Sequence, residues 1–208
     1  GEISQAGAVS VLFGFSPGIV TLADQFWHQD VPGLLGDGSE DQDRFGWSLA
    51  IGDFDMSGID DLAIGVPLED IEQKVDAGVV HVLYSKGTGP HLDGNQLWHH
   101  DRPNITGKPA EAYDGFGYSL ASGDINGDSF NELVIGTPGK ERDGKKGAGF
   151  VNIIPGSETG LTDWWDSFVT PDGAIPWTAP EEYDSFGNSL AILPAPKLHS
   201  LYLPVMVN

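Results

Sequence analysis

Two short acidic segments hold the residues of this chain that are best suited to chemistry. Residues 53–61 read DFDMSGIDD, and residues 124–132 read DINGDSFNE. In both segments, oxygen-bearing side chains stand at positions 1, 3, 5 and 9, and position 7 offers a backbone carbonyl. The predicted metal ligands are therefore Asp53, Asp55, Ser57, Ile59 and Asp61 in the first segment, and Asp124, Asn126, Asp128, Phe130 and Glu132 in the second.

The residue types and their spacing favour calcium as the bound ion. Alternate side chains of a tight loop point toward one centre, and Ca²⁺ takes about six to eight oxygen ligands at about 2.3–2.6 Å. The predicted ligands include no sulfur and no histidine, which disfavours zinc and copper. A flexible loop also does not impose the strict octahedron that Mg²⁺ prefers. We therefore expect two Ca²⁺ sites.

Neither segment is an EF-hand, because position 12 of the first would be Ile64, within a run that is typical of a strand. Gly58 stands at the sharp turn of the first segment, whereas Ser129 stands there in the second, so we expect the second site to bind more weakly. The alternative is a pair of solvated, aspartate-rich turns. Their recurrence at one phase of a repeat favours ion binding.

That repeat has a period of about 71 residues. Two independent markers keep it in step. A Phe-Gly pair recurs at 45–46, 116–117 and 186–187, and an Ala-Gly pair recurs at 6–7, 77–78 and 148–149. The third copy has lost its acidic residues, since the aligned positions are Pro194, Pro196, Leu198 and Tyr202.

Each repeat is expected to form four strands. Within one period, residues 48–53, 61–66, 79–84 and 96–99 are rich in β-branched and aromatic residues and are separated by Gly, Pro and Asp. Four antiparallel strands repeated radially describe a β-propeller blade. The sequence thus predicts an all-β fold, one propeller segment over 1–208 with about three blades, in repeats at about 7–77, 78–148 and 149–208.

The phase of the two chain ends suggests complementary halves of one blade. Residues 6–13 match a third strand, and residues 201–207 match a second strand. Three blades are fewer than the usual minimum of about four in a closed ring. We therefore expect a partial propeller that is completed by the remainder of a longer chain or by another copy.

Composition excludes several classes of partner. The chain has 10 Lys and Arg against 31 Asp and Glu, a formal charge of −21, so it repels nucleic acid and anionic lipid surfaces. The uncharged stretch from Ala6 to Ala23 is interrupted by Ser16, Pro17 and Gly18, which argues against membrane insertion. Cysteine is absent, so no thiol chemistry or disulfide framework is available.

The Phe-Gly pair followed by Ser-Leu, the acidic loop and then IGVP or IGTP resembles the FG-GAP repeat of integrin α-subunit propellers. Val66 and Thr137 replace the alanine of that motif. The resemblance implies a seven-bladed propeller with calcium loops in some blades, a secreted or cell-surface location, and a role in cell adhesion or in binding a protein or glycan ligand. Similar repeats occur in a phosphatidylinositol-glycan phospholipase D. This leaves an alternative, a propeller segment accessory to a phospholipase-like or glycan-degrading hydrolase in a longer chain.

Catalysis by the repeats themselves is not expected. The sequence around Ser48, Ser119 and Ser189 imitates a nucleophile elbow, but a serine that recurs in every repeat indicates a structural role. The acids two residues before each Phe-Gly pair also recur and are expected in turns: Asp43, Asp114 and Asp184. The adjacent histidines 99–100 are expected to be an exposed pair at a strand end. Tryptophans of the non-repetitive loop 162–180 are suited to ligand binding, namely Trp164, Trp165 and Trp177.

Overall fold

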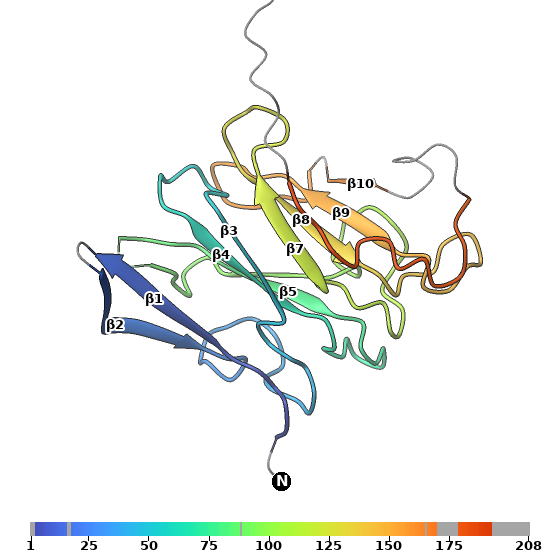
Figure 1. Ribbon diagram of the computed structural model, residues 1–208, viewed down its shortest axis with the longest axis horizontal. Coiled ribbons are helices and arrows are strands. Elements are labelled where there is room, and N and C mark those ends of the chain that lie inside the picture. Colours follow the sequence, from blue (N-terminus) through green and yellow to red (C-terminus); the bar gives the residue numbers. More distant parts are fainter. Residues whose placement is uncertain (1–2, 16–17, 88, 165, 170–178, 193–208) are drawn as a thin grey trace, which may run out of the picture.

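The described part of the protein is all-β. The computed structural model describes residues 3–15, 18–87, 89–164, 166–169 and 179–192, which contain strands and turns and no helix. The strands form three antiparallel sheets that lie side by side (Figure 1). The first sheet contains β1 (Val9–Phe15) and β2 (Gly18–Trp27); the second contains β3 (Ser48–Gly52), β4 (Asp61–Val66), β5 (Val79–Leu83) and β6 (Gln96–Trp98); the third contains β7 (Ser119–Gly123), β8 (Glu132–Thr137), β9 (Phe150–Ile154) and β10 (Ser167–Val169).

Both four-stranded sheets are meanders with the same register. Ser48 pairs with Gly65 in the second sheet, and Ser119 pairs with Gly136 in the third. β1 and β2 correspond in sequence to β5 and β6, so the first sheet is the second half of a blade. The predictions of four strands per repeat, and of a third strand near the start of the chain, are confirmed.

The blades are out of phase with the sequence repeats predicted at 7–77 and 78–148. The sheets extend over residues 48–98 and 119–169, so each of those repeats contains the last two strands of one blade and the first two of the next. The strand predicted at residues 201–207 lies outside the described residues. Within the described ranges, two complete blades and one half-blade are present.

Apolar side chains fill the space between neighbouring sheets, and β5 is therefore buried on both of its faces. Val80 and Val82 pack toward the third sheet in one core cluster, whereas Val79 and Leu83 join Trp27 of the first sheet in another. Strict alternation along a strand places these residues on opposite faces. Both faces of β5 are therefore buried, each against a neighbouring sheet.

Glycines allow adjacent sheets to approach at backbone distance. A Cβ added to Gly65, on β4, would lie 2.2 Å from the carbonyl oxygen of Gly117 in the next repeat. Gly117 has φ +85°, and a Cβ there would lie 2.7 Å from Cγ2 of Val80. The same approach recurs one repeat later, where a Cβ on Gly136 would lie 2.0 Å from the Gly187 carbonyl oxygen. The Phe-Gly glycine of one blade thus packs against the second strand of the preceding blade.

The repeated serine reinforces this contact. The Ser48 hydroxyl donates a hydrogen bond to the Gly117 carbonyl at 2.6 Å, and the Ser119 hydroxyl donates to the Gly187 carbonyl at 2.6 Å. A hydroxyl that satisfies a carbonyl of the neighbouring blade stabilises the interface by about 1 kcal/mol. The structural role predicted for the repeated serine is confirmed at these two positions.

We predict that Gly117→Ala lowers the free energy of unfolding by about 3 kcal/mol, because a methyl group at this position combines a positive φ with a close approach to Val80. Denaturant titration measures the loss. Gly144→Ala is the matched control, since Gly144 has φ +77° but nothing within 4 Å of its Cβ position. We expect it to cost about 1 kcal/mol. Equal losses in the two variants would contradict the close-packing argument.

Candidate functional site: two acidic loops

The two acidic segments form the turns between the first and second strands of the two complete blades. Residues 53–60 connect β3 to β4, and residues 124–131 connect β7 to β8. Because the two sheets share one register, both loops lie at the same end of the strands (Figure 1). Eight of the ten predicted ligands therefore lie in two equivalent turns, and the other two, Asp61 and Glu132, are the first residues of β4 and β8.

Three carboxylates converge in the first loop. One ligating oxygen from each of Asp53, Asp55 and Asp61 lies within 4.8 Å of the others. Asp61 is buried, and its two oxygens accept hydrogen bonds from the backbone amides of Ser85 at 2.8 Å and Phe54 at 2.9 Å. Oδ1 of Asp53 is also buried and has no hydrogen-bond partner. An unpaired buried carboxylate oxygen beside two other carboxylates fits a bound cation.

The electrostatics of the first loop also favour a cation. Burial raises the pKa of Asp61 to about 6, although hydrogen bonds from the amides of Ser85 and Phe54 oppose this effect. The charges of Asp55 and Asp53 contribute to this raised pKa. A divalent ion between these groups would remove the mutual repulsion that disfavours their ionised forms.

The backbone of the first loop is wound tightly around its own side chains. The amide of Gly58 donates to Asp53 at 2.8 Å, and the amide of Ser57 donates to Asp55 at 3.0 Å. The Ser57 hydroxyl lies 3.4 Å from the carbonyl oxygen of Ile59, so the predicted ligands at positions 5 and 7 are neighbours. Gly58 has φ +84°, as expected for the sharp turn at position 6.

The second loop has the same turn, but its ligand side chains are arranged differently. Asp124 accepts hydrogen bonds from the amides of Gly127 at 2.6 Å and Ser129 at 3.2 Å. The side-chain nitrogen of Asn126 lies between Asp128 at 2.8 Å and Glu132 at 3.2 Å. An amide group thus links the acids that would face a cation. Ser129 occupies the left-handed region with φ +78°.

Among the described residues, only the first loop brings three acidic ligand atoms within 4.8 Å of one another. The amide of Phe130 donates a hydrogen bond to Asp128 at 2.9 Å. Ca²⁺ binding at either loop, and weaker binding at the second, remain predictions.

Backbone hydrogen bonds connect the first loop to the next blade. The Asn131 amide donates to the Asp53 carbonyl at 3.1 Å, and the Ser157 amide donates to the Phe54 carbonyl at 3.1 Å. The ring of Phe54 is fully buried in the core between the two complete blades. Its equivalent in the second loop, Ile125, is largely exposed. The neighbouring blade therefore holds the backbone of the first loop at Asp53 and Phe54.

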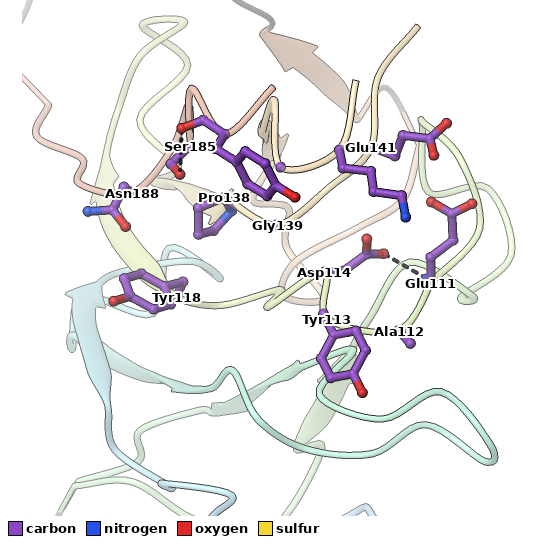
Figure 2. Close-up of a pocket in the computed structure, with 13 residues that line it drawn as sticks. Glu111, Ala112, Tyr113, Asp114, Tyr118, Pro138, Gly139, Glu141, Ser185 and Asn188 are labelled. Carbon is purple, nitrogen blue, oxygen red and sulfur yellow. Dashed lines mark hydrogen bonds between the residues drawn. The ribbon is translucent and has the colours of Figure 1, made fainter. Parts of the chain in front are cut away.

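A pocket of about 520 Å³ lies at the opposite end of the strands, between the loop before β7, the β8–β9 turn and residues 183–188 (Figure 2). Tyr113 and Tyr183 line it and are 66% and 73% exposed. Glu111 and Glu141 add carboxylates to the rim. Figure 2 shows the Tyr113 and Tyr118 rings and these carboxylates around the opening. The sequence interpretation did not identify this pocket, although both exposed tyrosines stand three residues before a Phe-Gly pair.

The structure places the remaining predicted residues as follows. The carboxylates of Asp114 and Asp184 accept hydrogen bonds from backbone amides three residues earlier, at 2.7 Å in each case, and Asp43 does the same, which confirms the predicted turn role. Trp164 is exposed, as expected, and Trp165 and Trp177 lie outside the described residues.

The expectation of an exposed histidine pair was wrong for His100. This side chain is 4% exposed, and its Nε2 lies 2.9 Å from Oδ1 of Asn152. β6 ends at Trp98, and the chain after it enters the interface between the two complete blades. The burial of His100 depends on a contact with a residue 52 positions away in the sequence, which the residues around His100 do not indicate.

Comparisons with known proteins agree with this arrangement. The family model described as FG-GAP repeat matches residues 45–83 and 116–151. Phosphatidylinositol-glycan-specific phospholipase D of Bos taurus is 32% identical over 140 residues, which is 67% of this chain and 16% of the relative. Integrin alpha-PS2 of Drosophila melanogaster is 36% identical over 121 residues, 56% of this chain and 8% of the relative. Integrin alpha-V of Gallus gallus is 36% identical over 98 residues, 47% of this chain and 8% of the relative. The chain thus spans a small part of the length of each of these relatives.

No helix with the length and hydrophobicity of a membrane span occurs in the described part of the chain.

We predict that Asp53→Asn abolishes Ca²⁺ binding at the first loop, because it removes a charge from the converging carboxylates and leaves a single side-chain oxygen, which the Gly58 amide needs as its acceptor. Calorimetric titration of the unsubstituted chain should find a dissociation constant on the order of 10⁻⁴ to 10⁻³ M. At a hundredfold excess of Ca²⁺ over that value, the ion should stabilise the fold by about 2.7 kcal/mol.

Asp60→Asn is the matched control for this prediction, since Asp60 is an exposed acid of the same loop that stands outside the ligand positions. Asp124→Asn tests the second loop in the same way and should remove the weaker site. An unfolding midpoint that is identical in excess chelator and in millimolar Ca²⁺ would show that neither loop binds the ion.

Proposed function

Because the chain carries FG-GAP repeats, we propose that it is a calcium-binding segment of a non-catalytic, extracellular β-propeller that acts in cell adhesion or ligand binding. The single observation that carries the proposal is the convergence of Asp53, Asp55 and Asp61 around a buried, unpaired carboxylate oxygen. The equivalent loop one repeat later supports it. The proposed ions are Ca²⁺, one in each loop.

The contacts of the reactive side chains support a non-catalytic role. Ser48 and Ser119 donate their hydroxyl hydrogens to carbonyls of the next blade, so neither is paired with a histidine that could activate it. The buried His100 is paired with Asn152. These groups are therefore engaged in the interfaces between blades.

The proposed extracellular location is consistent with the calcium affinity that loops of this type would need. Loops of this type that bind Ca²⁺ with dissociation constants near 10⁻⁴ to 10⁻³ M are filled at extracellular and not at cytosolic calcium levels. The formal charge of −21 is compatible with such a setting and disfavours nucleic acid as a partner. The location proposed is a secreted or cell-surface one.

The tyrosine pocket is the proposed ligand surface. Exposed tyrosine rings offer apolar area and a hydroxyl at a low cost in conformational entropy, which suits both peptides and glycans. Tyr118 extends this aromatic surface toward the second sheet, because its ring packs against Trp47 with 5.3 Å between centroids. The pocket lies away from the acidic loops, so ligand and calcium would bind at opposite strand ends.

A second candidate function rests on the phospholipase D relatives. This segment would then be a propeller accessory to a hydrolase, with the catalytic domain elsewhere in a longer chain. The 16% of the bovine relative that is matched leaves room for such a domain. The parent reading frame distinguishes the two functions, since a hydrolase domain beside the repeats would favour this second one. In both cases the remainder of a propeller, or another copy, would complete the ring.

We predict that Tyr113→Ala combined with Tyr183→Ala weakens ligand binding about tenfold or more, since buried aromatic anchors dominate interface energies. The measurement is binding of the labelled chain to an array of glycans and to a panel of matrix proteins. Trp164→Ala is the control, because Trp164 is an exposed aromatic residue outside the pocket. If Trp164→Ala abolishes binding and the tyrosine variant does not, the ligand surface is the loop at 162–180 instead.

A further inference from the structure

The two interfaces between blades differ in charge at equivalent positions. Between the second and third sheets, the buried ammonium of Lys140 donates to Asp114 at 2.7 Å and also to the carbonyl of Pro109. Lys108 pairs with Glu141 at 3.2 Å on the surface of the same interface. Two cations therefore compensate the acids of this interface.

The preceding interface has acids where those cations stand. Glu69 lies 71 residues before Lys140, and Asp37 lies 71 residues before Lys108. The acid equivalent to Asp114 is retained as Asp43. The interface between the first and second sheets thus has three carboxyl groups and neither of the two lysines.

These carboxyl groups repel one another in a buried setting. Glu69 is only 3% exposed, and Asp43 is buried as well. The pKa of Glu69 is raised to about 9, mainly by burial, with contributions from a hydrogen bond with the Asp37 carboxyl and from the charge of Asp43, while the hydrogen bond from Gln29 opposes the shift. A cation at this place would restore the compensation that Lys140 provides one repeat later.

Two polar side chains in this interface are buried without the partners that they need. His81 is 2% exposed, and neither of its ring nitrogens has a hydrogen-bond partner. Its Cε1 lies 3.5 Å from the Cβ position of Gly36, so the ring faces the turn that carries Asp37. The equivalent residue one repeat later is Asn152, which is bonded to His100. An unpartnered imidazole at this depth is an unusual and costly feature.

Gln29 is the second side chain with a buried atom that has no partner. Its nitrogen donates to Glu69, which places the amide against the carboxyl cluster, and its buried Oε1 has no partner. A buried acceptor oxygen and a neutral imidazole beside two carboxyl groups are the donor types that bind divalent metal ions.

A pocket of about 230 Å³ gives access to this cluster. Asp37 and Glu69 line it together with Asp70, Glu72 and His99. Asp37 is exposed at its mouth, whereas Glu69 lies at its buried side. A hydrated ion can therefore reach Glu69 from solvent without separation of the two sheets.

We infer that the interface between the first and second sheets binds a divalent metal ion, with Glu69, Asp37, His81 and the side-chain oxygen of Gln29 as its ligands. The ion would replace the ammonium of Lys140 in the next interface. The ligand atoms are less compact than those of the first acidic loop. The Asp37 and Glu69 carboxyl groups are already in contact, so on binding the His81 ring must move toward them and the Gln29 amide must turn its oxygen toward them. An imidazole ligand favours Mn²⁺, Co²⁺ or Zn²⁺ over Ca²⁺.

The test is a Co²⁺ titration of the full chain in saturating Ca²⁺, followed by calorimetry and by the visible absorption of the bound ion. The chain should bind one equivalent of Co²⁺ beyond the ions in the acidic loops. Glu69→Lys and His81→Asn should each abolish this equivalent, because they install the residues of the next repeat. The ammonium introduced by Glu69→Lys would pair with Asp43 as Lys140 pairs with Asp114, so this variant should remain folded.

Two control variants separate the site from non-specific binding. Glu158→Lys makes the same change of charge at an exposed position after β9, and His91→Asn removes a histidine that is not among the proposed ligands. Both variants should still bind the additional equivalent of Co²⁺. The absence of Co²⁺ binding by the unsubstituted chain, or binding that survives either interface substitution, would overturn the inference. The Asp53→Asn experiment with Ca²⁺ alone tests the acidic loops separately.

Discussion

The contact on which the rest of the structure depends is the approach of two backbones between adjacent blades. Gly65 and Gly117 leave no room for a side chain, since a Cβ on Gly65 would lie 2.2 Å from the facing carbonyl oxygen. Ser48 then satisfies that same carbonyl with its hydroxyl. Because the two backbones are in direct contact, this approach limits how the adjacent blades can be spaced. The Phe-Gly pair, the serine and the second-strand glycine of the repeat are parts of one interface.

A fixed backbone interface allows the polar residues around it to differ between repeats. The second interface is neutralised by Lys140, whereas the first has Glu69 in the same position. The histidine is also exchanged, because His81 in the first interface corresponds to Asn152 in the second. Such changes alter charge and ligand chemistry without altering the glycine contact. Repeats that share a fold can therefore bind different ions and ligands.

The meander divides the possible functions between the two ends of the strands. The acidic loops lie where the first strand of a blade turns into the second, and the tyrosine pocket lies at the opposite end. The shape of an acidic loop depends on its neighbour, since the first loop is bonded to the next blade through Asn131 and Ser157. Calcium in that loop would stiffen the interface at one end and leave the opposite end open to a ligand.

The sequence by itself determined the repeat, the four strands of each blade, the position of the acidic loops and the structural role of the serine. These features are recorded locally, in alternation, in turn residues and in a spacing that recurs. Only the tertiary structure decided that Asp53, Asp55 and Asp61 converge, that His100 and His81 are buried, and that Tyr113 and Tyr183 share a pocket. The burial of these histidines and the pocket depend on contacts between residues of different repeats, and the shape of the first loop depends on its bonds to the next blade. One sequence without its relatives carries no local signal for such contacts.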